Sequence, residues 1–104
     1  QIGEVLVPEG SAIRTLADLR GKRIGVAGGP DGLGSQLLQH AAAQDGIDLA
    51  KQATVQYAAP PLLSQALRRG QVDALLTFWH FSARMRGEGG VQVAFGLDDL
   101  LRSL

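Results

Sequence analysis

The sequence contains no cysteine and few aromatic residues. Its 104 residues include no Cys, one Trp, one Tyr and three Phe. The absence of cysteine excludes disulfides, thiolate metal sites and cysteine nucleophiles together, and it leaves the redox compartment undetermined. Any chemistry of this chain therefore rests on its other polar groups.

The chain also has no excess of charge and no long apolar run. Ten Lys and Arg residues balance ten Asp and Glu residues, so the formal net charge is zero. This balance does not favour a polyanion or an anionic membrane surface, and we expect no nucleic acid partner. No apolar run approaches the roughly 20 residues that a bilayer span needs. The first residues lack the charged and then apolar order of a signal peptide.

The length suits one small domain with a single modest core, so we treat residues 1–104 as one α/β domain. Hydrophobic patterning predicts strands that alternate with helical segments. The predicted strands cover 2–7, 22–27, 53–58, 72–78 and 91–95, and the predicted helical segments cover 15–21, 33–45, 60–70, 79–89 and 97–104. This order predicts a mostly parallel five-stranded sheet, covered by helices on both faces in a three-layer arrangement, with right-handed crossovers.

Two of the helices have a clear apolar face in the sequence. The first has apolar residues at helical spacing, with Gly46 as its stop: Leu33, Leu37, Leu38, Ala41 and Ala42. The second begins at two prolines and places four apolar residues on one face: Leu62, Leu63, Ala66 and Leu67. We expect both faces to pack against the sheet.

A glycine-rich stretch, GVAGGPDGLGSQLL over residues 25–38, follows the predicted strand 22–27 and opens a helix. Ligands of parallel α/β sheets bind beyond the carboxyl ends of the strands, and the free N–H groups of a helix start favour an anion. The hydroxyl of Ser35 adds a further polar group there. The alternative is structural: the glycines form a tight turn, and Asp31 caps the helix.

This stretch does not match the known nucleotide-binding motifs. In a P-loop a lysine follows the second glycine, but Ser35 follows Gly34 here. The dinucleotide fingerprint G-x-G-x-x-G is also absent from the glycines of this stretch. We therefore expect no nucleotide and no other cofactor.

A second candidate loop, TFWHFSARMR, follows the predicted strand 72–78. It holds the only Trp, two of the three Phe and one of the two His residues. Aromatic side chains at the end of a strand suit the apolar wall of a ligand site, with His80 as a hydrogen-bonding group. The alternative is that Phe78 and Phe81 belong to the core and Trp79 only packs.

The sequence has no motif for metal binding or for nucleophilic catalysis. It contains no H-x-x-x-H pattern and no cluster of His with carboxylates, so we expect no metal site. Ser35 and Ser64 have no evident base with an orienting acid, and there is no G-x-S-x-G elbow. We assign no catalytic residue.

Three phrases resemble a known family: TLADLRGKRIGVAGG at 15–29, LLSQALRRGQVDALLTF at 62–78 and GVQVAF at 90–95. They are similar to the periplasmic substrate-binding proteins of ABC transporters. The nearest branch is the nitrate, sulfonate and taurine (NMT1/THI5-like) branch, which includes proteins resembling the thiamine-pyrimidine synthases. The most specific pieces are L-x-D-L-x-G-K-x-I-G-V and A-L-x-x-G-Q-V-D-A, in this order.

The resemblance implies a two-lobe protein, of which this chain is one part. Members have two α/β lobes of the type 2 periplasmic-binding fold joined by two hinge strands, and the chain resembles the second, inserted lobe. The implied function is binding of a small molecule between the lobes, without turnover. The implied partners are the first lobe and a membrane permease. The implied location is the periplasm, with the export signal in the absent N-terminal portion.

The resemblance also implies the ligand-binding residues. By position they are Gly28, Gly29, Asp31, Gly32, Leu33, Gly34 and Ser35 in the first loop, and Thr77, Phe78, Trp79 and His80 in the second. The stretch TFWHF departs from the small residue and proline that are usual at this place in relatives. The resemblance therefore does not imply a particular ligand. We expect weak or undetectable binding by the isolated lobe, and self-association through surface that the first lobe would cover.

Two functions of other classes stay open at this stage. One is an enzyme, either a lobe of the thiamine-pyrimidine-synthase type or an α/β enzyme with His80 as base. The lack of cysteine disfavours the synthase. The other is a free-standing anion-binding regulatory domain. A receiver-type phosphoacceptor needs acids at strand ends, whereas Asp73 begins its predicted strand.

Overall fold

The computed structural model describes residues 3–97, apart from the side chain of Trp79. The strands are β1 (Gly3–Pro8), β2 (Arg23–Ala27), β3 (Thr54–Ala58), β4 (Ala74–Phe78) and β5 (Val91–Gly96). The helices are α1 (Leu33–Gln44), α2 (Leu49–Gln52), α3 (Pro60–Arg68) and α4 (Trp79–Glu88), with a 3₁₀ turn at Ala17–Leu19. All these elements except α2 were predicted. Residues 98–104 of the predicted last helix lie outside the described part.

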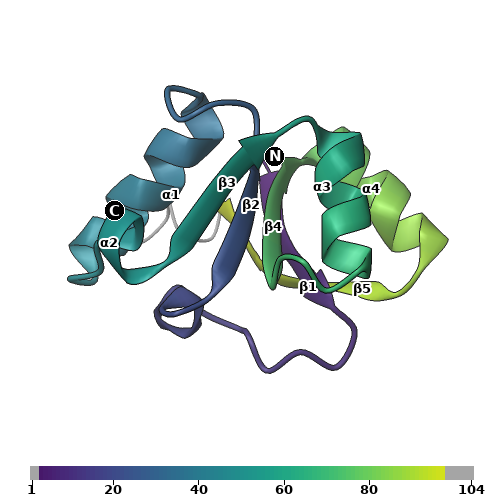
Figure 1. The fold of residues 1–104 in the computed structure, drawn as a ribbon, viewed down its shortest axis with the longest axis horizontal. Coiled ribbons are helices and arrows are strands. Elements are labelled where there is room, and N and C mark those ends of the chain that lie inside the picture. Colours follow the sequence, from purple (N-terminus) through teal and green to yellow (C-terminus); the bar gives the residue numbers. More distant parts are fainter. Residues whose placement is uncertain (1–2, 98–104) are drawn as a thin grey trace.

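The five strands form one sheet in the order β3-β2-β4-β1-β5. β2 pairs in parallel with both β3 and β4, whereas β1 is antiparallel to its neighbours β4 and β5. Four of the five strands therefore point the same way, which confirms the mostly parallel sheet. Figure 1 shows β1 as the strand that runs against the others.

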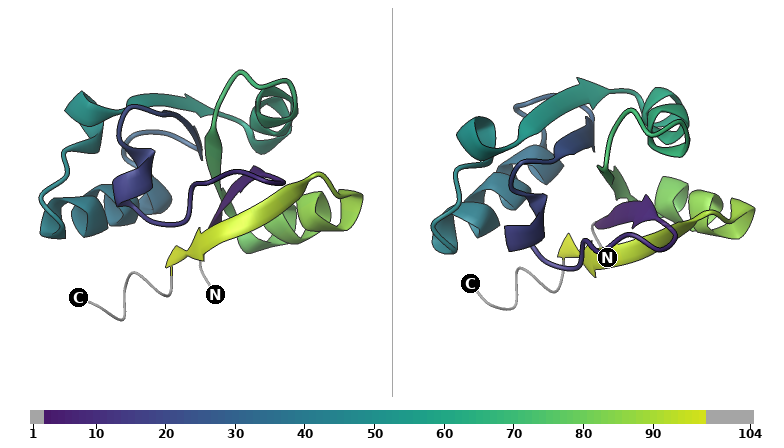
Figure 2. Two further views of the ribbon diagram at one scale, coloured as in Figure 1. Left: turned by 90° about the horizontal axis from the view of Figure 1, so that it is seen from below. Right: turned by 60° about the horizontal axis from the view of Figure 1, so that its bottom comes forward.

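The helices cover both faces of this sheet, as predicted. In Figures 1 and 2, α1 and α2 lie on one side of the sheet and α3 and α4 on the other. The neighbouring strands β2 and β4 thus send their following helices to opposite faces. Such a point, where the strand order reverses, leaves a crevice beyond the carboxyl ends of the two strands.

Each face has its own apolar cluster, because successive side chains of a strand point to opposite sides. Val5 and Val7 belong to the cluster under α1, and Leu6 belongs to the cluster under α3 and α4. The helices contribute Leu38, Ala41 and Ala42 on the first face and Leu63, Leu67 and Met85 on the second. The predicted core faces of both helices are confirmed for these residues.

Two leucines that were predicted to pack in the core are exposed instead. Leu33 begins α1 with 59% of its surface exposed, and Leu62 lies in the first turn of α3 with 63% exposed. Both continue the helical spacing of their buried neighbours. A place in the first turn does not by itself expose a side chain, since Ser35 and Leu63 of the same turns are buried.

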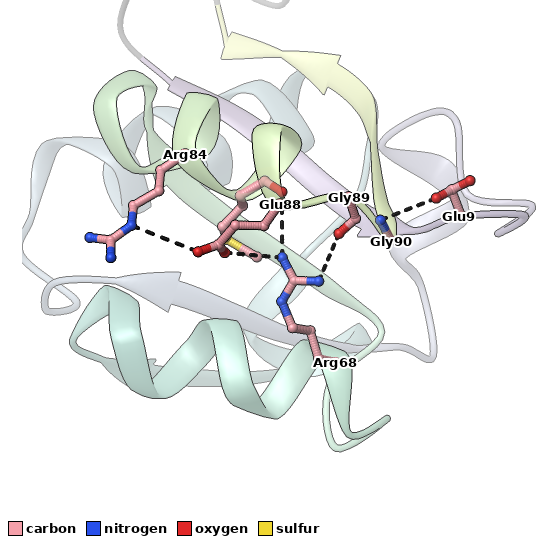
Figure 3. Close-up of polar contacts among 7 residues, drawn as sticks. Glu9, Arg68, Arg84, Glu88, Gly89 and Gly90 are labelled. Carbon is pink, nitrogen blue, oxygen red and sulfur yellow. Dashed lines mark hydrogen bonds and ion pairs between the residues drawn. The ribbon is translucent and has the colours of Figure 1, made fainter.

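The far ends of α3 and α4 are joined by one arginine. Arg68 donates from Nη1 to the carbonyl of Gly89 at 2.7 Å, and its Nη2 lies 3.4 Å from the Glu88 carboxylate (Figure 3). The adjacent Gly90 N–H donates to Glu9 at 3.1 Å. These bonds fix the end of α4 and the start of β5 to α3 and to the chain that leaves β1. Within residues 3–97 no helix is long and apolar enough to cross a bilayer.

Candidate functional site

The two predicted ligand loops meet at the carboxyl ends of the parallel strands. The loop between β2 and α1 lies at the upper edge of Figure 1, where β3 also ends. Its Gly28 N–H donates to the carbonyl of Ala58 at 3.2 Å. Phe78, at the end of β4, packs against α1 so closely that a Cβ on Gly34 would lie 3.4 Å from its ring. Gly34 and Phe78 thus bring the two loops into one place.

The glycine-rich loop reaches the helix without a side-chain cap. Gly28 has a φ of +101°, a left-handed conformation that glycine accepts without strain. The N-cap of α1 is Gly32, and no side chain caps this helix. The alternative in which Asp31 caps the helix is therefore wrong, because the chain places Asp31 one residue too early. Its carbonyl instead accepts from the Gln36 amide at 3.0 Å.

Three helices begin at this edge, and in the described part of the chain none of their N-cap residues makes a side-chain capping hydrogen bond. α1, α3 and α4 follow β2, β3 and β4 directly, with Gly32, Ala59 and Phe78 as N-caps that make no side-chain hydrogen bond. The first N–H groups of a helix have no partner inside it, and they carry the positive end of the helix dipole. This edge of the sheet therefore favours a negatively charged or acceptor group.

Exposed apolar side chains gather at the same edge. The described residues include four exposed large hydrophobic residues, and three of them, Leu33, Leu62 and Phe78, lie in the first turn of a helix or just before one. Phe78 has 39% of its surface exposed, so the alternative that this ring belongs entirely to the core is wrong. The half-buried Phe81 does pack against the core of α3 and α4.

A polar cluster joins the start of α1 to the end of β3. The Ser35 hydroxyl lies 3.2 Å from the Tyr57 hydroxyl, and the Gln39 amide donates to both, at 3.2 and 3.4 Å. Ser35 is only 2% exposed. Its direct presentation to a ligand is thus restricted, and its neighbour Tyr57 becomes a candidate that sequence reasoning missed. The alternation of β3 placed Tyr57 on the α1 face, but no sequence signal paired it with Ser35.

The residues of the second loop differ in their exposure. Thr77 is fully buried, and its hydroxyl has no hydrogen-bond partner in the described part of the chain. A buried hydroxyl without a partner costs about 1–3 kcal/mol. His80, in the first turn of α4, is exposed. Trp79 begins α4, and its side chain lies outside the described part.

A buried carboxylate fixes α4 to β1 near this edge. Glu4, 5% exposed, accepts a hydrogen bond of 2.6 Å from Ser82 and lies 3.4 Å from the Arg86 guanidinium. On β1 it stands directly opposite Thr77 of β4. Sequence reasoning missed this group, because Ser82 and Arg86 lie on a helix 78 or more residues away along the chain. The pair of contacts sets how α4 approaches the sheet.

Two hollows of the described part of the chain lie away from the predicted site. One of about 520 Å³ lies at the opposite edge of the sheet, lined by residues that include Ser11, Ile13, Lys22 and Asp73. Another of about 380 Å³ lies between α1 and α2. Neither is lined by residues 28–35 or 77–80.

The charged groups at the opposite edge form structural pairs. Asp73 precedes β4 and binds Arg23 through two hydrogen bonds of 3.1 and 3.0 Å. The hydrogen bonds from Arg23 hold the pKa of Asp73 below its usual value. Backbone N–H groups of Arg14 and Thr15 lower the pKa of Asp18 in the same way. Asp73 lies just before β4, at the amino end of this strand. A receiver-type phosphoacceptor would lie at the carboxyl end.

The described residues do not form a metal centre. Within residues 3–97 no group of three or more His, Asp and Glu side chains is arranged to hold an ion. What the carboxyl edge offers instead is a set of backbone N–H donors, hydroxyl groups and exposed apolar side chains. This arrangement can bind a small molecule with an acceptor group and an apolar part.

Comparisons with known proteins agree with the expected family. The family model described as NMT1/THI5 like matches residues 2–101. A search of the curated proteins finds no match. Among solved structures, the periplasmic aliphatic sulphonate binding protein SsuA from Escherichia coli is similar with a TM-score of 0.83 and 29% identity, over 95% of this chain and 33% of that chain.

Further solved structures share this fold. The alkanesulfonate-binding protein SsuA from Xanthomonas axonopodis pv. citri, bound to MOPS, is similar with a TM-score of 0.78 and 30% identity, over 90% of this chain and 32% of that chain. An ancestral arginine-binding protein bound to arginine has a TM-score of 0.70 and 24% identity, over 92% of this chain and 42% of that chain. At that identity the likeness concerns the fold alone.

The chain thus spans about a third of the length of the sulphonate-binding structures that it matches. The family match, in contrast, covers nearly the whole chain. The predicted resemblance and the predicted α/β lobe are both confirmed. On the sequence match over residues 2–101 and on this fold, the chain belongs to the NMT1/THI5-like family.

Proposed function

We propose that this chain is one lobe of a solute-binding protein that serves an ABC import system in the periplasm. The lobe provides one wall of a cleft, and a first lobe, outside these 104 residues, provides the other. A small molecule is bound between them without turnover. A membrane permease is the partner that receives it.

One observation carries this proposal: the helix starts without side-chain caps and the exposed apolar side chains of the lobe lie at a single edge. Three helix starts without side-chain caps meet there, together with Leu33, Leu62 and Phe78. Several large apolar side chains exposed at one edge are typical of an interaction site. The likeness to binding proteins about three times as long supports a second lobe as its cover.

The mechanism that fits this wall is closure of two lobes on the ligand. Backbone N–H groups of the first turns bind the acceptor group of the ligand, and the leucines and Phe78 contact its apolar part or the facing lobe. Closure removes water from both surfaces. The ligand stabilises the closed form by the difference between its binding free energies for the closed and the open form. One lobe alone supplies about half of the burial and therefore binds weakly.

An organic anion is the ligand class that the donors favour. In residues 28–35 and 77–80 the ionisable side chains are Asp31 and His80, so the attraction for an anion comes from N–H dipoles more than from formal charge. The sulphonate-binding proteins of the comparison make sulfonates the first compounds to test. We assign residues 28, 29 and 31–35 and residues 77–80 to this wall, with the buried side chains of Ser35 and Thr77 behind its surface.

A thermal-shift screen of the complete two-lobe protein tests the proposal. We expect a sulfonate, nitrate, a carboxylate or a pyrimidine to raise its Tm in a concentration-dependent way, since a ligand that binds only the folded state stabilises it. The proposal is contradicted if none of these compounds raises the Tm, or if a bound compound is converted to product.

A further inference from the structure

The cluster of Ser35, Gln39 and Tyr57 has two hydroxyl protons, but only one hydrogen bond within the cluster needs a hydroxyl proton. The Gln39 amide nitrogen donates to the hydroxyl oxygens of Ser35 and Tyr57, and one hydrogen bond of 3.2 Å joins those two oxygens. Each hydroxyl carries a single proton. One of the two protons fills the bond between them, and no other partner for the remaining proton lies in the described part of the chain.

Burial decides which proton remains. If Tyr57 donated to Ser35, the Ser35 proton would be left without an acceptor in a residue that is only 2% exposed. An unpaired buried donor is strongly disfavoured, because it loses its hydrogen bond to water and gains none in the protein. If Ser35 donates to Tyr57 instead, the remaining proton belongs to the half-buried Tyr57, whose bond with Gln39 lies at the surface. The second arrangement is therefore the stable one.

In this arrangement the proton of the Tyr57 hydroxyl is available to donate a hydrogen bond to a ligand. It accepts two hydrogen bonds, from Ser35 and from Gln39, and such chains of hydrogen bonds strengthen the outgoing donor. Tyr57 is the second-last residue of β3, and the next residue, Ala58, accepts the N–H of Gly28. The phenol thus lies against the first turn of α1, at the edge where the glycine-rich loop begins.

We propose that Tyr57 is a ligand-binding and specificity-determining residue, whose hydroxyl donates to an anionic oxygen of the solute. This inference rests on the proposed function, because it places Tyr57 in the wall of the same cleft. The ligand class follows from the direction of the bond: a sulfonate or carboxylate oxygen accepts from the phenol, whereas an ammonium group cannot.

Calorimetry on the complete two-lobe protein tests this with methanesulfonate, acetate and MOPS as anionic probes and ethylammonium as the cationic one. Tyr57→Phe removes the donor and keeps the ring. We expect its Kd for the anion that the wild type binds to rise about tenfold, the effect of one hydrogen bond to a charged group. The matched control is Thr54→Val, which removes a hydroxyl from the other end of β3, and its Kd should stay unchanged.

The results separate this inference from the function on which it rests. Wild-type binding with an unchanged Kd in Tyr57→Phe overturns the role of Tyr57 and leaves the two-lobe function intact. A wild type that binds only ethylammonium overturns the ligand class. A wild type that binds none of the four probes contradicts both the role of Tyr57 and the anion-binding cleft.

A second measurement needs no ligand. Tyr57 is the only tyrosine of the chain, so the Raman Fermi doublet of tyrosine reports its hydrogen bonding alone. We expect the doublet of the 104-residue chain to be that of a phenol that accepts hydrogen bonds, and Ser35→Ala to shift it towards a phenol that does not. A doublet typical of a phenol that mainly donates, unchanged in Ser35→Ala, overturns the assigned proton arrangement.

Discussion

The glycines between residues 28 and 34 differ in what the lobe requires of them. Gly28 has a positive φ, a Cβ on Gly32 would lie 3.1 Å from the Gly29 carbonyl, and a Cβ on Gly34 would touch Leu76 and Phe78. Gly29 has neither constraint, since a Cβ there would meet nothing within 4 Å. The folded lobe thus does not require a glycine at position 29. A ligand that approaches the backbone of Gly29 would require one, because a side chain there would be in its way.

Gly29→Ala should therefore reduce ligand binding and leave folding unchanged. An extra methyl group in a packed contact costs about 1–3 kcal/mol, so the Kd of the complete protein should rise at least about fivefold. Its free energy of unfolding should change by less than about 0.5 kcal/mol, as at most surface positions. Calorimetry and urea unfolding measure the two effects.

Gly87→Ala is the matched control for this substitution. Gly87 lies in α4, and a Cβ there also meets nothing within 4 Å. Its affinity should equal that of the wild type. If Gly29→Ala binds as tightly as Gly87→Ala, the glycine-rich loop does not contact the ligand.

The ion pair at the opposite edge gives a prediction about pH. Hydrogen bonds from Arg23 lower the pKa of Asp73 in the folded state, so the stabilisation is present above the ordinary carboxyl value of about 4 and is lost as the pH falls through the folded value. Asp73→Asn should cost up to about 1 kcal/mol at pH 7. The loss of stability caused by Asp73→Asn should vanish when unfolding is measured at a pH below the folded pKa of Asp73.

Asp45→Asn serves as control, because Asp45 has no ion pair among residues 3–97 and it ends α1 at the surface. We expect no loss of stability from it at pH 7. An equal cost of Asp73→Asn at neutral and acidic pH would mean that the carboxylate charge contributes nothing.

At the scale of the elements, Arg68 determines how α4 ends. The last carbonyls of a helix have no partner inside it, and the guanidinium of Arg68 takes up those of Met85 and Gly89. Arg68→Met should lower the free energy of unfolding by about 1–2 kcal/mol, because it removes the partner of the Gly89 carbonyl and one of the two partners of the Met85 carbonyl and of the Glu88 carboxylate. Arg69→Met, the neighbouring exposed arginine, should change it by less than about 0.5 kcal/mol. Urea unfolding measures the free energy of unfolding of both variants. Equal losses in Arg68→Met and Arg69→Met would contradict the role of Arg68.

The sequence predicted most elements but not how they pair. Hydrophobic periodicity located α1, α3 and the strands to within about two residues, because core packing imposes that period. It could not predict that β1 runs antiparallel, since the alternation within a strand is the same for both directions. It also missed α2, whose four residues are too short for a period to be recognised.

The candidate site was predictable in place and less so in detail. The carboxyl edge followed from the alternation of strands and helices, and the two loops do meet there at Gly34 and Phe78. The pairing of Ser35 with Tyr57 spans 22 residues, and no local pattern encodes it. Leu33 was assigned to the core by its helical spacing and to the site by the family resemblance, and only the structure shows that its side chain is exposed.

At the scale of the whole molecule, the lobe leaves an apolar edge uncovered. We expect the isolated chain to self-associate through Leu33, Leu62 and Phe78, because burial of apolar surface drives association. Leu62→Ser should weaken this association in sedimentation experiments, since Leu62 is the most exposed of the three. The control is Val93→Ser on β5, an exposed apolar residue away from this edge. Equal effects of both variants would contradict an interface at the edge.

The central claim is that the lobe holds half of a binding site. Calorimetry with the ligand found in the thermal-shift screen tests it most directly, on the complete protein and on the 104-residue chain side by side. We predict tight binding by the complete protein and weak or undetectable binding by the single lobe, because each lobe supplies only part of the contacts. Sub-micromolar binding by the 104-residue chain alone would contradict the account.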